Sequence, residues 1–253
     1  MKIFNSLKVA FAMYSKIPTG RTDWSEENLR YSMCFVPLVG FVIGIALIFW
    51  HWIYVKLSFN DIFYGCTASL IPLVITGGIH MDGYIDVMDA LSSYGEKEKK
   101  LEILKDPHVG AFAVIWAAAY MIAMAGIFSQ AATEKEVVLI SLGFVLSRAV
   151  ACLLAMLSQN ARKEGTLYTF IKSQAKRTVS TVLVLFIAGA GCACFMVDYV
   201  VGFLISCVFA VLIAWFCRMV RKNFGGMTGD MAGFLIQVSE LFMAFTVVIG
   251  CRL

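Results

Sequence analysis

Long apolar stretches alternate with short polar ones along the whole chain. Seven of these stretches approach the roughly 20 mostly apolar residues that a helix needs to cross the hydrocarbon core of a bilayer. The stretches are residues 33–55, 62–79, 109–128, 137–157, 178–197, 199–220 and 231–250. The pattern predicts an all-α fold, a polytopic membrane helical bundle with about seven transmembrane helices.

Two details of the pattern refine this picture. Little more than Asp198 separates the fifth and sixth stretches, so we expect a tight helical hairpin and not one very long span. Residues 1–32 form a polar N-terminal arm, and residues 3–14 within it are expected to form a short interfacial helix. Its lipid-facing residues are predicted to be Phe4, Leu7, Phe11 and Tyr14.

Composition supports a membrane protein and excludes an ordinary soluble domain. Hydrophobic residues make up 60% of the chain and charged residues only 15%, whereas soluble domains carry about 25% charged residues. The eight cysteines lie mostly inside the predicted spans without metal-binding spacing, so we expect buried thiols. With no sign of a soluble domain or a repeat, residues 1–253 are predicted to form a single integral membrane domain.

The positive charges predict how the bundle is oriented. Lys and Arg collect in cytoplasmic loops, and here 17 of the 21 lie in the arm and in the loops after the second, fourth and sixth stretches. This alternation predicts a cytoplasmic N-terminus, an outside C-terminus and residence in the cytoplasmic (inner) membrane. Topology and anionic lipid headgroups then explain the net charge of +4, and no nucleic-acid partner is expected.

Three carboxylates follow the second apolar stretch. If this segment is helical, Asp82, Asp86 and Asp89 are spaced i, i+4 and i+7 and fall within one stripe. Like charges so placed repel one another, and Mg²⁺ or Mn²⁺ would remove that cost while bridging the carboxylates to a phosphate. We therefore predict that the three aspartates are catalytic metal ligands; a solvated acidic helix face is the plainer alternative.

Other polar residues of the same face are candidates for substrate or phosphate binding. Glycines beside the aspartates are Gly77, Gly78 and Gly83, and His80 could help to position a substrate. A glycine-rich turn before the last span could hold a phosphate on free backbone N–H groups, although Asp230 would also make an ordinary N-cap. The candidates in that turn are Gly225, Gly226, Thr228, Gly229 and Asp230.

Charged groups complete the candidate set. Lys105 could neutralise a phosphate during catalysis, and Asp106 could add a metal ligand. Arg162 offers a fork-shaped guanidinium, although ordinary positive-inside charge explains it equally well. Arg148 and Glu240 lie inside predicted spans, where each needs a partner in the bundle interior. They could pair with each other or contact the substrate.

The order and spacing of these motifs resemble the cobalamin synthase family, also called the adenosylcobinamide-GDP ribazoletransferase family. The resemblance covers nearly the whole chain. It rests on residues 15–18, 76–83 with Asp86 and Asp89, 101–106 with Gly110, 147–148, 161–162 with 164–165, 225–230 and Glu240. The resemblance implies that Asp82, Asp86 and Asp89 form the family's acidic motif.

The resemblance also implies the reaction. The ribose 3′-hydroxyl of α-ribazole, or of its 5′-phosphate, would attack adenosylcobinamide-GDP, GMP would leave, and the nucleotide loop of adenosylcobalamin or its 5′-phosphate would be closed. This phosphotransferase would require Mg²⁺ and act in the cytoplasmic membrane, with its active site facing the cytoplasm. Its partners would be the two substrates and the lipid bilayer, and a homo-oligomer is left open.

Three rival functions fit the sequence less well. A phosphatidyltransferase that exchanges CMP for an alcohol has a D-G-x-x-A-R motif, but Asp86 and Val87 occupy the Ala-Arg positions here, and no second acidic block follows at the required spacing. A prenyl-diphosphate transferase needs two aspartate-rich motifs, and Asp230 alone is a poor second one. A transporter would place its functional polar residues near the bilayer midplane, whereas most of these lie at one face.

Overall fold

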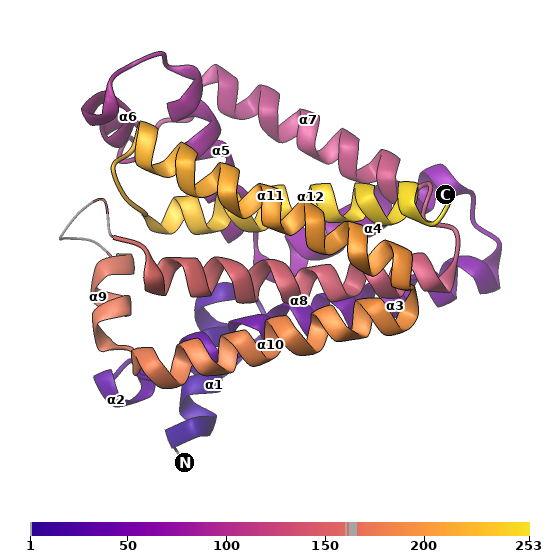
Figure 1. Cartoon of the computed structure of the whole chain (residues 1–253), viewed down its shortest axis with the longest axis horizontal. Helices are drawn as coiled ribbons and strands as arrows, with labels where there is room; N and C mark the ends of the chain where they lie inside the picture. The colour runs from indigo at the N-terminus through magenta and orange to yellow at the C-terminus, as the bar shows by residue number, and fades with distance from the viewer. Residues whose placement is uncertain (1, 160, 162–165) are drawn as a thin grey trace.

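A computed structural model describes residues 2–159, 161 and 166–253 of the chain. Within these residues every regular element is helical, as the apolar pattern predicts. The long helices run side by side along the longest axis of the molecule (Figure 1). They are α3 (Val36–Leu57), α4 (Asp61–Thr76), α7 (Ala111–Phe128), α8 (Glu134–Leu157), α10 (Lys176–Val197), α11 (Tyr199–Asn223) and α12 (Gly229–Gly250).

Shorter helices gather mainly at one end of the bundle, on the left of Figure 1. They are α1 (Lys2–Tyr14), α2 (Glu26–Leu29), the 3-10 helix η1 (Ser32–Phe35), α5 (Ile79–Ser92), α6 (Lys97–Ile103) and α9 (Thr166–Ser173). Two loops that carry several Lys and Arg residues, the α5–α7 loop and the α8–α10 loop, lie at this end. The last turn of α11, with Arg221 and Lys222, and the α11–α12 turn lie there as well. We call this end the polar end of the bundle.

The number of spans depends on one broken helix. Six of the described helices are each long and apolar enough to cross a membrane, and α4 and α5 reach this standard only as a pair bent by 99°. The chain therefore has six candidate spans, or seven if the bent pair crosses the bilayer once. The apolar part of the pair is α4, and we place α5, with its three aspartates, outside the spans.

The break in this pair corrects the predicted second span. Residues 62–79 were expected to form one continuous helix, but α4 ends at Thr76. Gly77 and Gly78 both have left-handed backbones, with φ of 64° and 79°, a conformation that glycine adopts at no steric cost. Because Gly77 ends α4 and Gly78 starts α5, the aspartates lie on a separate helix with its own direction.

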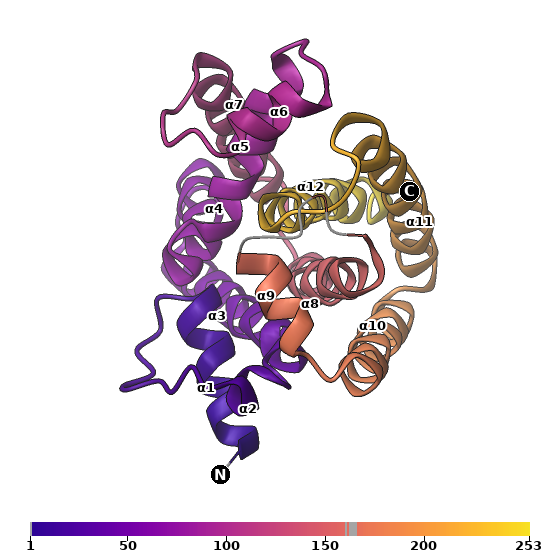
Figure 2. The same ribbon diagram turned by 90° about the vertical axis from the view of Figure 1, so that its left-hand side faces the viewer.

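Helices α8 and α12 form the centre of the bundle, and Figure 2 shows the other long helices around them. Small residues let these helices approach closely. A Cβ atom at Gly40 of α3 would lie 2.1 Å from the Phe144 carbonyl oxygen of α8, and one at Gly44 would lie 3.0 Å from the Ser141 side chain. Helix α3 thereby packs closely against the central helix α8.

The predicted hairpin is confirmed. Helix α10 ends at Val197 and α11 begins at Tyr199, with Asp198 between them. The Asp198 carboxylate accepts a hydrogen bond from the Val201 N–H at 3.0 Å, so this residue caps the second helix as it ends the first.

The N-terminal arm forms the expected helix, but the prediction that Tyr14 faces lipid is wrong. Phe4 is 63% exposed, in keeping with a lipid-facing position. Tyr14 instead points into the bundle, where its ring lies 6.0 Å from the ring of His80. The chain reverses after Tyr14, and the Lys16 N–H donates to the Ile75 carbonyl at 2.8 Å. This bond ties the arm to the end of α4 and turns Tyr14 inward.

Candidate active site at the polar end

Helix α5 carries the three predicted aspartates on one stripe, as their spacing requires. They differ in environment: Asp82 is exposed, whereas Asp86 and Asp89 are half-buried. The plainer alternative was a solvated acidic helix face. It does not describe this stripe, because two of the three carboxylates are half-buried.

Two glycines bring α5 against the start of α12. A Cβ atom at Gly83 would lie 2.6 Å from the carbonyl oxygen of Asp230, and one at Gly233 would lie 3.0 Å from the carbonyl oxygen of His80. No larger residue fits at Gly83 unless the backbone of α12 moves. The structure thus gives Gly83 a packing role, and this contact joins the Asp82 motif to the glycine-rich turn.

The approach of the two helices gathers four carboxyl groups. Burial raises the pKa of Asp86 to about 6, and neighbouring carboxylates add to the rise. These neighbours are Asp82, Asp230 and Asp89. A half-buried carboxyl surrounded by acidic groups has the chemistry of a site for a hard divalent cation. Among the described residues, however, no three acidic, His or Cys side chains are arranged so as to enclose a metal ion.

Asp89 has a second environment of its own. A Cβ atom at Gly110 would lie 2.2 Å from one Asp89 carboxylate oxygen, and Gly110 is the N-cap of α7. A carboxylate beside the first turn of a helix is stabilised by the positive end of the helix dipole. Asp89 therefore also fixes the start of α7.

The glycine-rich turn differs from its prediction at one residue. Helix α12 begins at Gly229 with Thr228 as its N-cap, so Asp230 lies in the first turn and is not the cap. The Thr228 hydroxyl donates to the Asp230 carboxylate at 3.2 Å. Gly225 has a left-handed backbone with φ of 75°. Together with Gly226, it lines a separate cavity of about 380 Å³.

The structure brings neither charged candidate of the second loop to the aspartates. Asp106 accepts hydrogen bonds from the His108 N–H at 3.0 Å and pairs with the His108 ring at 2.6 Å. Lys105 is exposed, and among the described residues its ammonium group forms no ion pair with an aspartate. Arg162 lies outside the residues that the structure describes.

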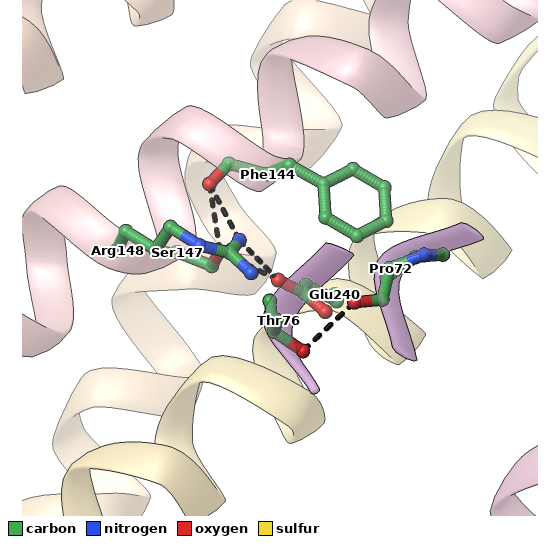
Figure 3. Close-up of polar contacts among 6 residues, drawn as sticks. All are labelled: Pro72, Thr76, Phe144, Ser147, Arg148 and Glu240. Atoms are coloured by element: carbon green, nitrogen blue, oxygen red, sulfur yellow. Dashed lines mark hydrogen bonds and ion pairs between the residues drawn. The ribbon is translucent and has the colours of Figure 1, made fainter. Parts of the chain in front are cut away.

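Arg148 and Glu240 form an ion pair in the core, between the two central helices. A guanidinium nitrogen of Arg148 lies 2.6 Å from a Glu240 carboxylate oxygen, and both side chains are 1% exposed. The same nitrogen donates to the Phe144 carbonyl at 2.9 Å, and the Ser147 hydroxyl donates to Glu240 at 3.2 Å (Figure 3). The structure thus favours the pairing alternative over contact with a substrate.

A cavity of about 190 Å³ opens between α1, α5, α8 and α12, directly beside the aspartates. The exposed Asp82 and the half-buried Asp230 line it, and His80 forms part of its wall. His80 is only 3% exposed, and its Nε2 atom has no hydrogen-bond partner among the residues that the structure describes. Burial, aided by the positive charge of Arg148, holds the pKa of His80 well below its ordinary value. The imidazole is therefore neutral.

Several residues of this site were missed by the sequence analysis. Tyr14, Cys152 and Phe170 line the cavity, and the Lys16 side chain covers Gly77 at the helix break. Two local signals were present in the sequence: Tyr14 precedes the turn at residues 15–18, and Cys152 follows Arg148 by one helical turn. Phe170 reaches the cavity from α9, and nothing in its local sequence indicates that contact.

Comparisons with known proteins give a consistent result. A family model described as cobalamin-5-phosphate synthase matches residues 6–248. A protein of Lachnoclostridium phytofermentans named adenosylcobinamide-GDP ribazoletransferase is 40% identical, covering 99% of this chain and 95% of that protein. Proteins of the same name from Desulfitobacterium hafniense and Clostridium botulinum are 30% and 27% identical, each covering at least 95% of both chains. No solved structure matches the chain.

Proposed function

The chain belongs to the cobalamin-5-phosphate synthase family, and from this premise we propose that it is an adenosylcobinamide-GDP ribazoletransferase. The reaction joins adenosylcobinamide-GDP to α-ribazole or its 5′-phosphate and releases GMP. It completes the nucleotide loop of a cobalamin.

One structural observation carries the proposal. The contact of Gly83 with Asp230 places two glycine- and aspartate-containing motifs, far apart in the sequence, at the mouth of one cavity. Transfer of a phosphate-linked group needs negative charge to be balanced and two substrates to be held close together. Carboxylates that would hold Mg²⁺ meet the first need, and the cavity beside them meets the second.

The chemistry assigns roles to named residues. A ribose hydroxyl oxygen forms a bond to the phosphorus next to the cobinamide, the bond from that phosphorus to the oxygen bridging to the GMP phosphate breaks, and GMP leaves. Asp82, Asp86 and Asp230 would hold Mg²⁺, which would in turn bind the phosphates, with Asp89 as a further ligand. When bound, Mg²⁺ would offset negative charge on the phosphates. One aspartate would accept the proton of the attacking hydroxyl.

Basic residues would support the same site from the polar end. Lys16 lies at the helix break, and Lys105 belongs to the α5–α7 loop of this end. Arg162, outside the described residues, is included on the strength of the sequence alone. We assign them to phosphate binding and place this end on the cytoplasmic side of the inner membrane, because Lys and Arg favour that side. The distribution supports an enzyme and not a transporter, since the site lies at one end of the bundle.

The experiment is a direct assay of the full chain purified in detergent. Adenosylcobinamide-GDP, α-ribazole and Mg²⁺ are mixed with the protein, and GMP and the corrinoid product are followed by mass spectrometry. We expect GMP and product in equal amounts, and neither after chelation with EDTA. Absence of GMP under all conditions would contradict the proposal.

Matched aspartate variants locate the chemistry. Asp82→Asn and Asp86→Asn should each reduce turnover by at least about 100-fold, because each removes a charge from the site. Asp61→Asn is the control, since Asp61 starts α4 away from the polar end and contacts Tyr54. Equal activity in all three variants would remove the aspartates from the mechanism.

A further inference from the structure

The residues that line the cavity beside the aspartates, together with its volume, determine which chemical group of the two substrates it can bind. Its wall is apolar apart from Tyr14, His80, Cys152 and the two carboxylates of Asp82 and Asp230. The cavity volume of about 190 Å³ slightly exceeds the roughly 150 Å³ of an engineered apolar cavity that takes benzene. It can therefore hold a small flat ring system and excludes a corrin ring.

Three rings of the protein surround this space. The Tyr14 ring lies 6.0 Å from the His80 ring and 6.5 Å, edge to face, from the Phe170 ring. These rings come from α5, α9 and the arm, so the aromatic wall forms only when all three are docked. Aromatic walls of this kind favour a flat aromatic ligand, whose faces and edges find complementary partners.

The polar atoms of the cavity wall narrow the choice of bound ring further. His80 is buried, and its Nε2 atom has no hydrogen-bond partner among the described residues, an arrangement that is costly unless a ligand supplies one. Guanine carries several donors and acceptors on its edges. With Asp82 and Asp230 assigned to Mg²⁺, most of these groups would be left unpaired against the rest of the wall. A benzimidazole-type base linked to ribose has one free ring nitrogen. This nitrogen can form a hydrogen bond with the one unpartnered ring nitrogen of His80, Nε2.

We propose that this cavity is the binding subsite for the heteroaromatic base of the ribazole acceptor, with His80 as the residue that positions the base through its free ring nitrogen. The inference rests on the proposed function. The ribose would then leave the cavity beside Asp82 and Asp230, which line it and of which Asp82 is exposed. The attacking hydroxyl would emerge at the carboxylate cluster.

A cavity-filling variant tests the location. Ala155 lines the cavity and is 1% exposed, so Ala155→Leu would occupy space that the base needs. The control is Ala118→Leu, because Ala118 is exposed on α7. For the full chain in detergent we expect the KM for α-ribazole to rise at least about tenfold in Ala155→Leu, with the KM for adenosylcobinamide-GDP changed less than twofold. A rise confined to adenosylcobinamide-GDP, or no rise for either substrate, would overturn the proposal.

A substrate analogue tests the role of His80 without relying on that variant. In the analogue the free ring nitrogen of α-ribazole is replaced by C–H. The wild-type KM should be about tenfold higher for the analogue than for α-ribazole, the size expected for a buried hydrogen bond. In His80→Ala the two acceptors should have equal KM values, which a purely structural role of His80 would not produce. Equal values in the wild type, or continued discrimination in His80→Ala, would contradict the assignment.

The proposed function and the proposed subsite are tested by different results. Release of GMP by the wild type in the presence of α-ribazole decides the proposed function. Given that release, the KM pattern of the variants and the analogue decides the subsite.

Discussion

Asp86 is a carboxyl group surrounded by others. Its pKa is raised from 3.8 to about 6 by burial first and by neighbouring carboxylates second. A raised carboxyl pKa means that the folded protein holds more protons than the unfolded chain between about pH 4 and pH 6. Without a metal, the stability of the fold therefore falls as the pH rises through this window. The penalty is fully present above pH 6.

This fall in stability with rising pH leads to a prediction for thermal unfolding. In EDTA at pH 7.5, Asp86→Asn should melt about 2–4 °C above the wild type, the shift expected for roughly 1 kcal/mol in a chain of this size. At pH 4 the difference should vanish. Intrinsic tryptophan fluorescence of the detergent-purified proteins measures both values. A variant that melts below the wild type at pH 7.5 would show that repulsion at Asp86 does not limit stability.

Mg²⁺ should reverse this order of melting temperatures, so that the wild type melts above Asp86→Asn. Metal bound by the aspartates stabilises the folded state by mass action, and at pH 5 it must displace the proton of Asp86. We expect Mg²⁺ to raise the melting temperature of the wild type at pH 7.5, to raise it much less at pH 5, and to leave Asp86→Asn nearly unchanged. An equal shift in both proteins would place the metal elsewhere.

The Arg148 and Glu240 pair permits a different test at the residue scale. Removing one partner of a buried pair typically costs about 3–5 kcal/mol, because a lone charge is left buried, whereas replacing both by apolar residues is often neutral. Arg148→Met should therefore yield little folded protein, and Arg148→Met with Glu240→Leu should recover it. The measurement is the monodisperse fraction in size-exclusion chromatography. Failure of the double variant to recover would show that the charges themselves are needed.

At the scale of elements, the crossing of α5 and α12 determines whether the site exists. A Cβ atom at Gly83 would lie 2.6 Å from the Asp230 carbonyl oxygen, so Gly83→Ala must push the two helices apart. We expect kcat/KM to fall at least about tenfold, since misplacement of reacting groups by about 1 Å can cost 100-fold. Gly126→Ala on α7 is the control, because nothing lies within 4 Å of its added Cβ. Full activity in Gly83→Ala would separate this crossing from catalysis.

Elements were predictable where one local property determines them. The length of an apolar stretch identified most of the long helices, and Asp198 marked the hairpin because a single polar residue there can cap α11. The break after Thr76 was missed because the next residues, through Ile79, include two glycines that do not lower hydropathy enough to mark it. Thr228 precedes Asp230 by only two residues, and sequence alone does not choose between two such caps.

The composition of the site shows where sequence reasoning stops. Clustering of the acidic and glycine-rich motifs at one end followed from the alternation of polar loops. The cavity wall did not follow, because Tyr14, Cys152 and Phe170 come together only when the arm and α9 dock on α8. Asp106 has the right residue type and a nearby sequence position, yet its hydrogen bonds to His108 engage it in its own loop.

At the scale of the whole molecule, the open question of six or seven crossings can be tested. Seven crossings place the C-terminus on the side opposite the basic loops, as the charge distribution predicts. Alkaline phosphatase, which folds only outside the cytoplasm because it needs disulfides, should be active when fused after Leu253. Inserted after Glu98 in α6, it should be inactive. Five spans separate the two positions in either case. With the N-terminus in the cytoplasm, an active phosphatase after Glu98 and an inactive one after Leu253 would mean that α4 and α5 form a re-entrant loop and that six helices cross.

The early end of α4 also affects the surrounding lipid. Its 16 residues span about 24 Å at 1.5 Å per residue, whereas the hydrocarbon core is about 30 Å thick. Exposed Ile62, Leu70 and Val74 show that α4 meets lipid along its length. Local thinning of the bilayer is one way in which a membrane accommodates so short a span, and we expect it on this side of the bundle. Headgroups and water would then sit deeper beside the α4–α5 break than elsewhere. This would lower the barrier for a large, partly polar corrinoid to reach the aspartates along the membrane surface.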